Sequence, residues 1–239
     1  MAVSEVFKMK KIAIVGIARD CELSLIRFYN FVEELRKEHA IDIFIYENDS
    51  KDDSPRIIKK ISHEYLCEIH NLPKLPQLAT YERADYLAGC RNKSLGLIDG
   101  SYDFLVISDL DLFKWPDPTR ISYNIDMMGR HEEIAAVTSN GLDMHEGREI
   151  YYDSWPILNT DNLNIPGAYF DPPKKGYHDV NSAFGGLAIY KFDICKNNDV
   201  SYAAGYMTDI DGKVRPSSDH TYFNKQLIDL GYKIYIDYE

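Results

Sequence analysis

Near the middle of the chain lies the sequence Tyr102-Asp103-Phe104-Leu105-Val106-Ile107-Ser108-Asp109-Leu110-Asp111-Leu112-Phe113. Its segment 104–108 is short and mostly apolar, which is typical of a strand buried on both faces of an α/β sheet. Two carboxylates, Asp109 and Asp111, follow this segment directly. Because ligands of open α/β sheets bind beyond the carboxyl ends of the strands, we expect both acids to face a binding site.

Two carboxylates so close together repel each other. A hard divalent cation such as Mg²⁺ or Mn²⁺ relieves this repulsion and can also hold phosphate oxygens. The pair Asp109 and Asp111 therefore indicates a metal-assisted enzyme that acts on a diphosphate. The alternative is that the two acids only end a strand at the protein surface.

Composition restricts the class of protein. A chain of 239 residues can bury one full-sized core, so we expect a single domain over residues 1–239 with a loose leader at 1–10. The net charge of -11 argues against nucleic acid or an anionic membrane as a partner, because Lys and Arg bind phosphate groups. No segment has the length of a membrane span, and the cysteines form no C-x-x-C pair. We therefore expect a soluble, cytoplasmic protein.

The first part of the chain alternates predicted strands and helices. Apolar runs predict strands at 11–17, 42–47 and 65–69, and amphipathic patterns predict helices from residue 24 and over 54–62. Strands and helices that alternate at this spacing form parallel sheets with right-handed crossovers. We therefore expect the opening half of a nucleotide-binding α/β fold.

The next predicted helix, residues 81–98, carries an arginine within its apolar stripe. The stripe consists of Ala84, Leu87, Ala88, Arg91, Leu95 and Ile98. A buried guanidinium needs an anionic partner, because its desolvated charge is otherwise costly. The partner of Arg91 is either a bound anion or a structural aspartate, of which Asp109 is one candidate. Arg83, two turns earlier, can serve the same region.

Two later segments carry signals of ligand binding. Segment 141–175 is rich in Gly, Pro, Asn, Asp and aromatic residues without a clear period, which is typical of a lid or an acceptor-binding loop. Its aromatic side chains either stack on sugar rings or only hold the loop in place. Segment 180–190 predicts a strand interrupted by Gly185 and Gly186, which permit a bulge or the close approach of a ligand.

The last predicted helix begins at the sequence Ser217-Ser218-Asp219-His220. Ser217 or Ser218 is a suitable N-cap. His220 faces inward from the first turn, where the positive helix end disfavours imidazolium and leaves a neutral ring that can bind a metal. An inward histidine is also commonly a satisfied core residue. An alternating strand over 232–237 closes the chain.

In this order, these features resemble the GT-A glycosyltransferases, in particular capsule-associated mannosyltransferase-like proteins and glycosyltransferase domains of large chlorella viruses. The features are the βαβ half, the triplet Asp109-Leu110-Asp111, the segment Phe184-Gly185-Gly186 and the pair Asp219-His220. Each motif is short, and only the ordered set, which covers about residues 12–237, is specific. The resemblance implies a GT-A fold, with a Rossmann-like nucleotide-binding half and a mixed, mostly parallel sheet flanked by helices.

The resemblance also implies an activity and a site. The activity is transfer of a hexose from a nucleoside-diphosphate sugar, with UDP favoured over GDP, to a glycan or glycoprotein acceptor. A cofactor Mn²⁺ or Mg²⁺ would be held by Asp109, Asp111 and His220. The donor would be bound by Gly16, Ala18, Arg19, Glu47, Asn48, Asp49, Arg83, Arg91, Asp109, Gly185 and Gly186.

The catalytic residues depend on the stereochemistry. An inverting enzyme needs a carboxylate base on the acceptor hydroxyl, for which Asp179 and Asp219 are candidates, while Arg91 would approach the diphosphate or the donor sugar. A retaining enzyme needs no dedicated base. The Asp-x-Asp triplet together with His220 resembles retaining members more, so we expect retention.

Two other classes of protein fit part of the pattern. A phosphohydrolase of the haloacid-dehalogenase kind would use Asp109 and Asp111 as nucleophile and acid, although that motif normally follows the first strand. A non-catalytic sugar-binding module would explain the aromatic residues of segment 141–175, but it leaves the acid pair, Arg91 and His220 without a shared purpose.

Overall fold

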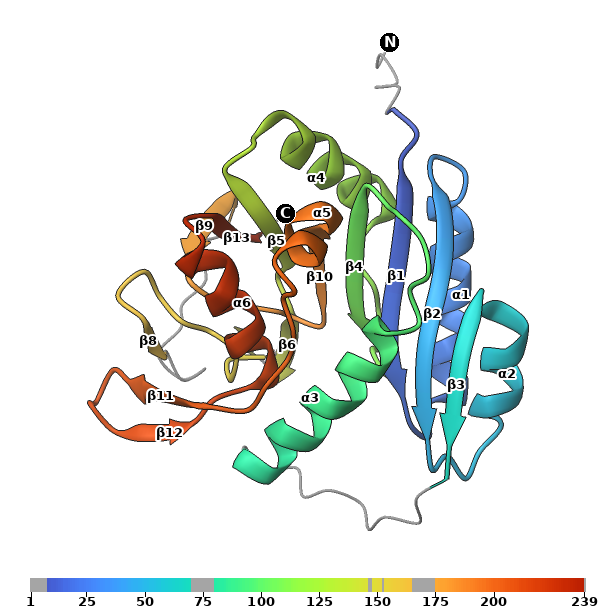
Figure 1. Cartoon of the computed structure of the whole chain (residues 1–239), viewed down its shortest axis with the longest axis horizontal. Helices are drawn as coiled ribbons and strands as arrows, with labels where there is room; N and C mark the ends of the chain where they lie inside the picture. The colour runs from blue at the N-terminus through green and yellow to red at the C-terminus, as the bar shows by residue number, and fades with distance from the viewer. Residues whose placement is uncertain (1–7, 70–79, 146–147, 152, 165–174, 239) are drawn as a thin grey trace.

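A computed structural model describes residues 8–69, 80–145, 148–151, 153–164 and 175–238. An eight-stranded sheet with strand order β3-β2-β1-β4-β10-β5-β13-β9 forms the body of the protein (Figure 1). The strands of this sheet are β1 (Lys11–Ala18), β2 (Ala40–Asn48), β3 (Glu64–Glu68), β4 (Phe104–Asp109), β5 (Ile134–Ser139), β9 (Tyr177–Val180), β10 (Leu187–Lys191) and β13 (Lys233–Asp237).

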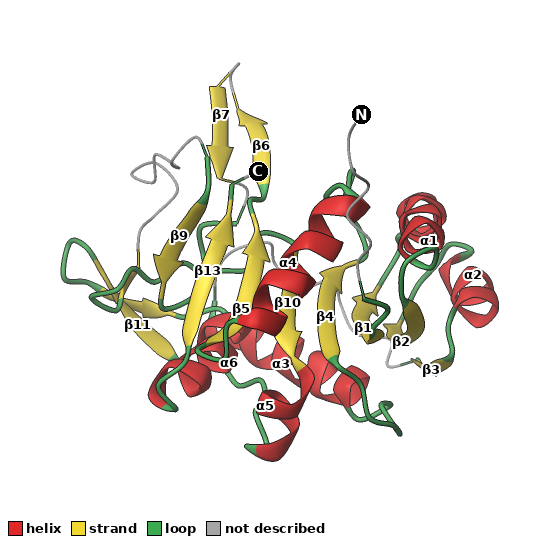
Figure 2. Cartoon of the chain, turned by 90° about the horizontal axis from the view of Figure 1, so that it is seen from above, coloured by secondary structure: helices red, strands yellow, loops and turns green. Residues whose placement is uncertain are grey.

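Helices cover both faces of the sheet (Figure 2). On one face pack α1 (Glu22–Leu35), α2 (Ser54–Ile61) and α4 (Pro118–Arg130), and on the other pack α3 (Tyr81–Leu95), α5 (Phe192–Asn197) and α6 (Asp219–Asp229). Each face has its own apolar core, because the buried strands carry apolar side chains in both directions. No described helix is long and apolar enough to cross a membrane.

The first four strands confirm the predicted parallel arrangement of the first half of the fold. β1 pairs in parallel with β2 and with β4, and β2 pairs in parallel with β3. The carboxyl ends of these strands therefore lie along one edge of the sheet. Asp109, the last residue of β4, and Asp111, in the loop after it, lie at that edge beside residues that follow β1.

The second half makes the sheet mixed. β10 runs antiparallel to both of its neighbours, β4 and β5, and β13 pairs in parallel with β5 and antiparallel with the edge strand β9. The sheet is therefore mixed, as the predicted fold class requires.

The prediction of one interrupted strand over 180–190 is wrong. The segment belongs to two separate strands, β9 and β10, and Gly185 and Gly186 lie in their connection with φ of 63° and 83°. A Cβ atom at Gly185 would lie 2.1 Å from the carbonyl oxygen of Ser139, and one at Gly186 would lie 2.8 Å from the Leu112 side chain. Glycine is therefore favoured at both positions for two reasons. Other protein atoms lie too close for a Cβ atom, and the positive φ values suit glycine best.

Smaller elements extend from the sheet. β8 (Leu163–Asn164), β11 (Tyr206–Asp209) and β12 (Val214–Pro216) form a three-stranded sheet, and β6 (Leu142–His145) pairs with β7 (Arg148–Tyr151). The described part of segment 141–175 therefore contains three short strands. Residues 146–147, 152 and 165–174 of this segment and the first seven residues of the predicted leader lie outside the described residues.

Candidate functional site

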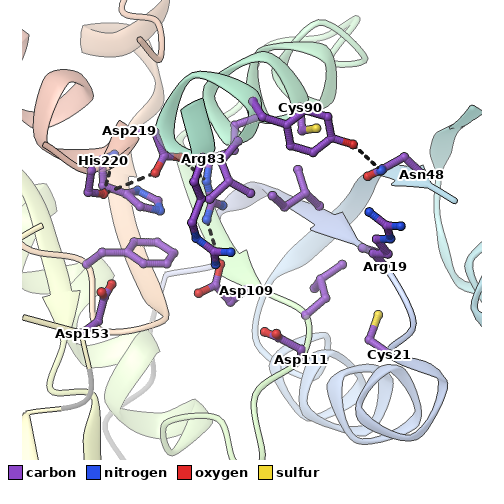
Figure 3. A pocket seen from close by; sticks show the side chains of 18 of the residues that line it. Arg19, Cys21, Asn48, Arg83, Cys90, Asp109, Asp111, Asp153, Asp219 and His220 are labelled. Carbon is purple, nitrogen blue, oxygen red and sulfur yellow. Dashed lines mark hydrogen bonds and ion pairs between the residues drawn. The ribbon is translucent and has the colours of Figure 1, made fainter. Parts of the chain in front are cut away.

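A cavity of about 420 Å³ opens at the carboxyl ends of β1, β2 and β4 (Figure 3). The loops after these strands, α3, the start of α6 and segment 153–155 form its walls. The cavity brings together nine of the predicted site residues: Ala18, Arg19, Asn48, Arg83, Arg91, Asp109, Asp111, Asp219 and His220.

Three predicted donor-binding residues at the strand ends do not line the cavity. At Gly16 the packing of the Leu110 side chain leaves no room for a larger residue, because a Cβ atom there would lie 2.7 Å from that side chain. Glu47 is buried and accepts a hydrogen bond from the backbone N–H of Ser50 at 2.9 Å, so it shapes the turn after β2. Asp49, with φ of 58°, is buried in the same turn.

The remaining predicted residues also lie elsewhere. Asp179 is exposed on the edge strand β9 and is not part of the cavity wall. Gly185 lines a second cavity of about 720 Å³ on the other side of Asp111, and Gly186 packs on Leu112. The backbone carbonyl of Gly186 accepts a hydrogen bond from the N–H of Asp109 at 2.9 Å, so the glycine segment supports the acid loop.

Arg91 is the electrostatic centre of the cavity wall. Its side chain is 6% exposed, its Nε donates to Oδ2 of Asp219 at 2.7 Å, and its Nη2 donates to Oδ1 of Asp109 at 2.8 Å. The guanidinium also lies 5.2 Å from the ring centroid of Phe184 and 5.7 Å from that of Tyr202. Burial opposes the charge, but the two carboxylates outweigh it and raise the pKa of Arg91. Within the described chain, the anions that Arg91 needs are therefore aspartates of the protein itself.

α6 begins at the cavity with the predicted capping residue. The hydroxyl of Ser218 accepts a hydrogen bond from the backbone N–H of His220 at 3.1 Å. Asp219, 2% exposed, has a pKa raised by burial, and the neighbouring guanidinium of Arg91 limits the rise. The cap thus fixes the position of a buried carboxylate next to Arg91.

His220 is held by aromatic rings rather than by the acids. Its ring stacks on that of Phe184 with centroids 3.5 Å apart, and its Nδ1 lies 3.5 Å from the Tyr202 hydroxyl. Burial and the charge of Arg91 lower its pKa well below the usual value, so the ring is neutral. Its Nε2 is buried and has no hydrogen-bond partner among the described residues.

The carboxylates of the cavity fit a hard divalent cation. The pKa of Asp111 is raised mainly by the enclosed surroundings of its carboxylate in the cavity and further by the charge of Asp109, and a cation beside the two acids would counter their repulsion. Mg²⁺ in particular is commonly held by one or two carboxylates together with substrate phosphates and water. No three His, Cys, Asp or Glu side chains of the described residues form a complete set of metal ligands, so the predicted trio with His220 is not assembled.

Asp153 is a site residue that sequence reasoning missed. It enters the cavity from the segment after β7, and Trp155 anchors that segment by donating from Nε1 to the carbonyl oxygen of Pro216 at 2.9 Å. Burial, together with the charges of Asp109 and Asp219, raises the pKa of Asp153 to about 8. The sequence offers one sign of this role, an acid within the aromatic-rich segment 141–175. The spacing of Asp153 in the sequence does not indicate that Asp109 and Asp219 lie near it in the fold.

Replacing Asp153 with Asn is expected to stabilise the protein at mildly alkaline pH. The carboxyl has a pKa near ~3.9 in an unfolded chain and about 8 in the folded protein. Between these values the unfolded chain releases a proton that the folded protein keeps, so the free energy of unfolding falls as the pH rises. Because Asp153 is partly exposed, we expect the variant to gain only about 1–2 kcal/mol near pH 8 and nothing near pH 4. Thermal unfolding across this range measures the effect, and parallel pH profiles for the two proteins would contradict it.

Comparisons of the sequence with known protein families and with curated proteins find no match. The structure is similar to a mannosyltransferase of Pyrobaculum calidifontis solved with GDP-Man and Mn²⁺, with a TM-score of 0.52 and 12% identity over 96% of this chain and 57% of that one. It is also similar to S. aureus TarS 1-349 solved with UDP-GlcNAc, with a TM-score of 0.54 and 12% identity over 95% of this chain and 55% of that one.

A third similar structure is a mycobacterial protein, with a TM-score of 0.53 and 14% identity over 95% of this chain and 65% of that one. The chain spans little more than half the length of the mannosyltransferase and of TarS. At these identities the similarity concerns the arrangement of the backbone. The chain has the GT-A fold of the glycosyltransferases.

Proposed function

We propose that this protein is a glycosyltransferase that moves a hexose from a nucleoside-diphosphate sugar to a glycan acceptor. The observation that carries the proposal is the position of Asp109 and Asp111 in a cavity at the carboxyl ends of β1, β2 and β4 of a GT-A fold. Two proteins with this fold were solved with GDP-Man and with UDP-GlcNAc. The donor nucleotide would lie against Ala18, Arg19 and Asn48, at the ends of β1 and β2.

The charge of the cavity supports a metal-dependent reaction. Three arginines and five aspartates line its walls: Arg19, Arg83, Arg91, Asp20, Asp109, Asp111, Asp153 and Asp219. An anionic diphosphate would therefore meet a wall with a net negative charge unless a cation binds with it. Asp111, with Asp109, would hold Mn²⁺ or Mg²⁺, which supplies Lewis-acid stabilisation of the leaving diphosphate.

The arginines have different roles in this proposal. Arg91 uses Nε and Nη2 on the two aspartates, so it holds the carboxylates of Asp219 and Asp109 at fixed positions in the wall. Arg83, on the first turn of α3, also lines the cavity and would contact the diphosphate.

The proposed stereochemistry rests on the resemblance. The Asp109-Leu110-Asp111 triplet together with His220 resembles retaining enzymes more, so we propose retention, which needs no dedicated base. An inverting reaction would instead need a carboxylate that takes the proton of the acceptor hydroxyl, and of the two candidates Asp219 lines the cavity whereas Asp179 lies outside it. The anomeric configuration of the first product formed, followed by NMR, distinguishes inversion from retention.

Calorimetric titration of UDP and GDP, each with and without Mn²⁺, tests the proposed function. We expect UDP to bind in the presence of Mn²⁺ and to bind much more weakly without it. Binding of GDP instead would change the donor and leave the enzyme class intact. Failure of both nucleotides to bind in the presence of metal would contradict the proposal, and phosphorylation of Asp109 by a phosphate ester would identify a phosphohydrolase instead.

A further inference from the structure

The hairpin of β11 and β12 exposes one apolar face. In its register Tyr206 lies opposite Pro216 and Thr208 lies opposite Val214, so these four side chains share a face. Tyr206 is 65% exposed and Val214 is 71% exposed. On the other face Met207 is buried, and Arg215, which lies opposite it, is half exposed but charged. Apolar exposure on this hairpin is thus confined to one side.

An aromatic residue from α3 extends this face. Tyr81, the first residue of α3, stacks on Tyr206 with ring centroids 5.4 Å apart and an interplanar angle of 20°. Figure 1 shows the beginning of α3 approaching the hairpin. We name Tyr81, Tyr206 and Val214 the tyrosine platform. Tyr81 is also exposed, so the stacked rings leave aromatic surface open to solvent.

The tyrosine platform borders the candidate active site. The N–H of Ser217 donates to the carbonyl of Gly205, which precedes Tyr206, at 2.9 Å, and the next residue, Ser218, lines the cavity. Tyr81 lies two residues before Arg83, which lines the cavity from α3. Both tyrosines are therefore within a few residues of the cavity wall, on the side of Asp219.

The tyrosine platform lies on the Asp219 side of the cavity, away from the end where the proposed donor nucleotide would bind. In Figure 3, Asn48 and Arg19 lie on one side of the cavity and Asp219 and His220 lie on the other. The platform is also uncharged, and the neighbouring Arg215 is engaged through Nε with Oδ2 of Asp209 at 2.6 Å. A neutral ligand that approaches from the Asp219 side fits this surface better than the anionic donor does.

We propose that the tyrosine platform binds the neutral sugar rings of the acceptor glycan. This inference rests on the proposed function, which requires an acceptor hydroxyl to reach the cavity. The C–H faces of sugar rings pack on aromatic rings, and tyrosine adds a hydroxyl that hydrogen-bonds to sugar hydroxyls. The acceptor chain would lie across Tyr81 and Tyr206 while its terminal residue enters the cavity beside Asp219.

Binding of defined oligosaccharides to the whole chain tests the proposal. The probes are tetrasaccharides of glucose, of mannose and of N-acetylglucosamine, titrated by saturation-transfer NMR. We expect at least one of them to bind, and Tyr206→Ala and Tyr81→Ala to weaken its binding by about 5–10-fold. Tyr206→Phe keeps the aromatic face and should cost at most about twofold.

Tyr123→Ala is the matched control, because Tyr123 is 41% exposed but lies on α4, which packs on the opposite face of the sheet from α3. The proposal is overturned if no tetrasaccharide binds the wild-type protein, or if the platform variants bind as tightly as the control. It is also overturned if Tyr206→Ala instead abolishes self-association of the chain. Parallel titrations of UDP and GDP with Mn²⁺ separate the hypotheses, since loss of nucleotide binding concerns the proposed function alone.

Discussion

The Arg91→Met variant is expected to unfold with a free energy about 3–5 kcal/mol lower than that of the wild-type protein. The substitution leaves Asp219, whose side chain is 3% exposed, with a buried and uncompensated charge. The loss of Arg91 costs less at Asp109, because the side chain of Asp109 is 21% exposed and water can solvate its charge. Urea unfolding followed by circular dichroism measures the difference.

Two further variants identify the cause of that loss. Arg91→Lys keeps the charge, but a single ammonium cannot reproduce the two directed bonds from Nε and Nη2, so an intermediate loss is expected. The double variant with Arg91→Met and Asp219→Asn removes the stranded charge together with its partner and should recover part of the stability. An Arg91→Met protein within about 1 kcal/mol of wild type would show that water already compensates Asp219.

The Asp111→Asn variant is expected to lose about a thousandfold in metal-dependent sugar transfer. In our proposal Asp111 holds the cation that stabilises the leaving diphosphate, and such a cation contributes several kcal/mol to the transition state, where about 1.4 kcal/mol corresponds to tenfold. The side chain of Asp111 lies on the cavity wall and is repelled by Asp109, so the substitution should not lower the stability of the fold. The measurements are Mn²⁺-dependent nucleotide affinity and release of nucleotide from the donor sugar.

Asp20→Asn is the control for this experiment. Asp20 lines the same cavity and carries the same charge, but it accepts a hydrogen bond from the backbone N–H of Lys51 at 2.6 Å and follows β1 rather than β4. We expect it to retain Mn²⁺-dependent nucleotide binding. If Asp111→Asn retains it equally well, the cation is not bound at the acid pair.

The sequence predicts the first half of the fold well, because that half is built from long apolar runs that alternate with amphipathic helices. It also predicts the burial of Arg91, since a charge within an apolar stripe conflicts with the helical pattern around it. The partner Asp219 lies 128 residues further along the chain, and periodicity carries no information over such a separation. The same limit applies to Asp153, whose place in the cavity depends on the tertiary fold.

The features that the sequence does not predict have physical causes as well. The sequence does not reveal β11 and β12, because a strand of three or four residues has too few positions for a recognisable alternation. The pair Gly185 and Gly186 indicates that something approaches closely but not what approaches, and in the structure protein atoms lie next to both positions. The position of His220 in its helix predicts a metal ligand, and the helical pattern carries no sign of the aromatic rings that pack around it.

The antiparallel strand β10 has a consequence for the order in which the sheet assembles. β1, β2, β3 and β4 can pair as soon as the first 109 residues are available. β5, although it follows soon after β4 in the chain, joins them only through β10, which ends at residue 191. The apolar β5 segment therefore stays unpaired on the side that β10 will occupy until about fifty further residues have been synthesised. At ordinary rates of synthesis this takes several seconds. During that interval the unpaired backbone edge of this segment is open to association with other chains.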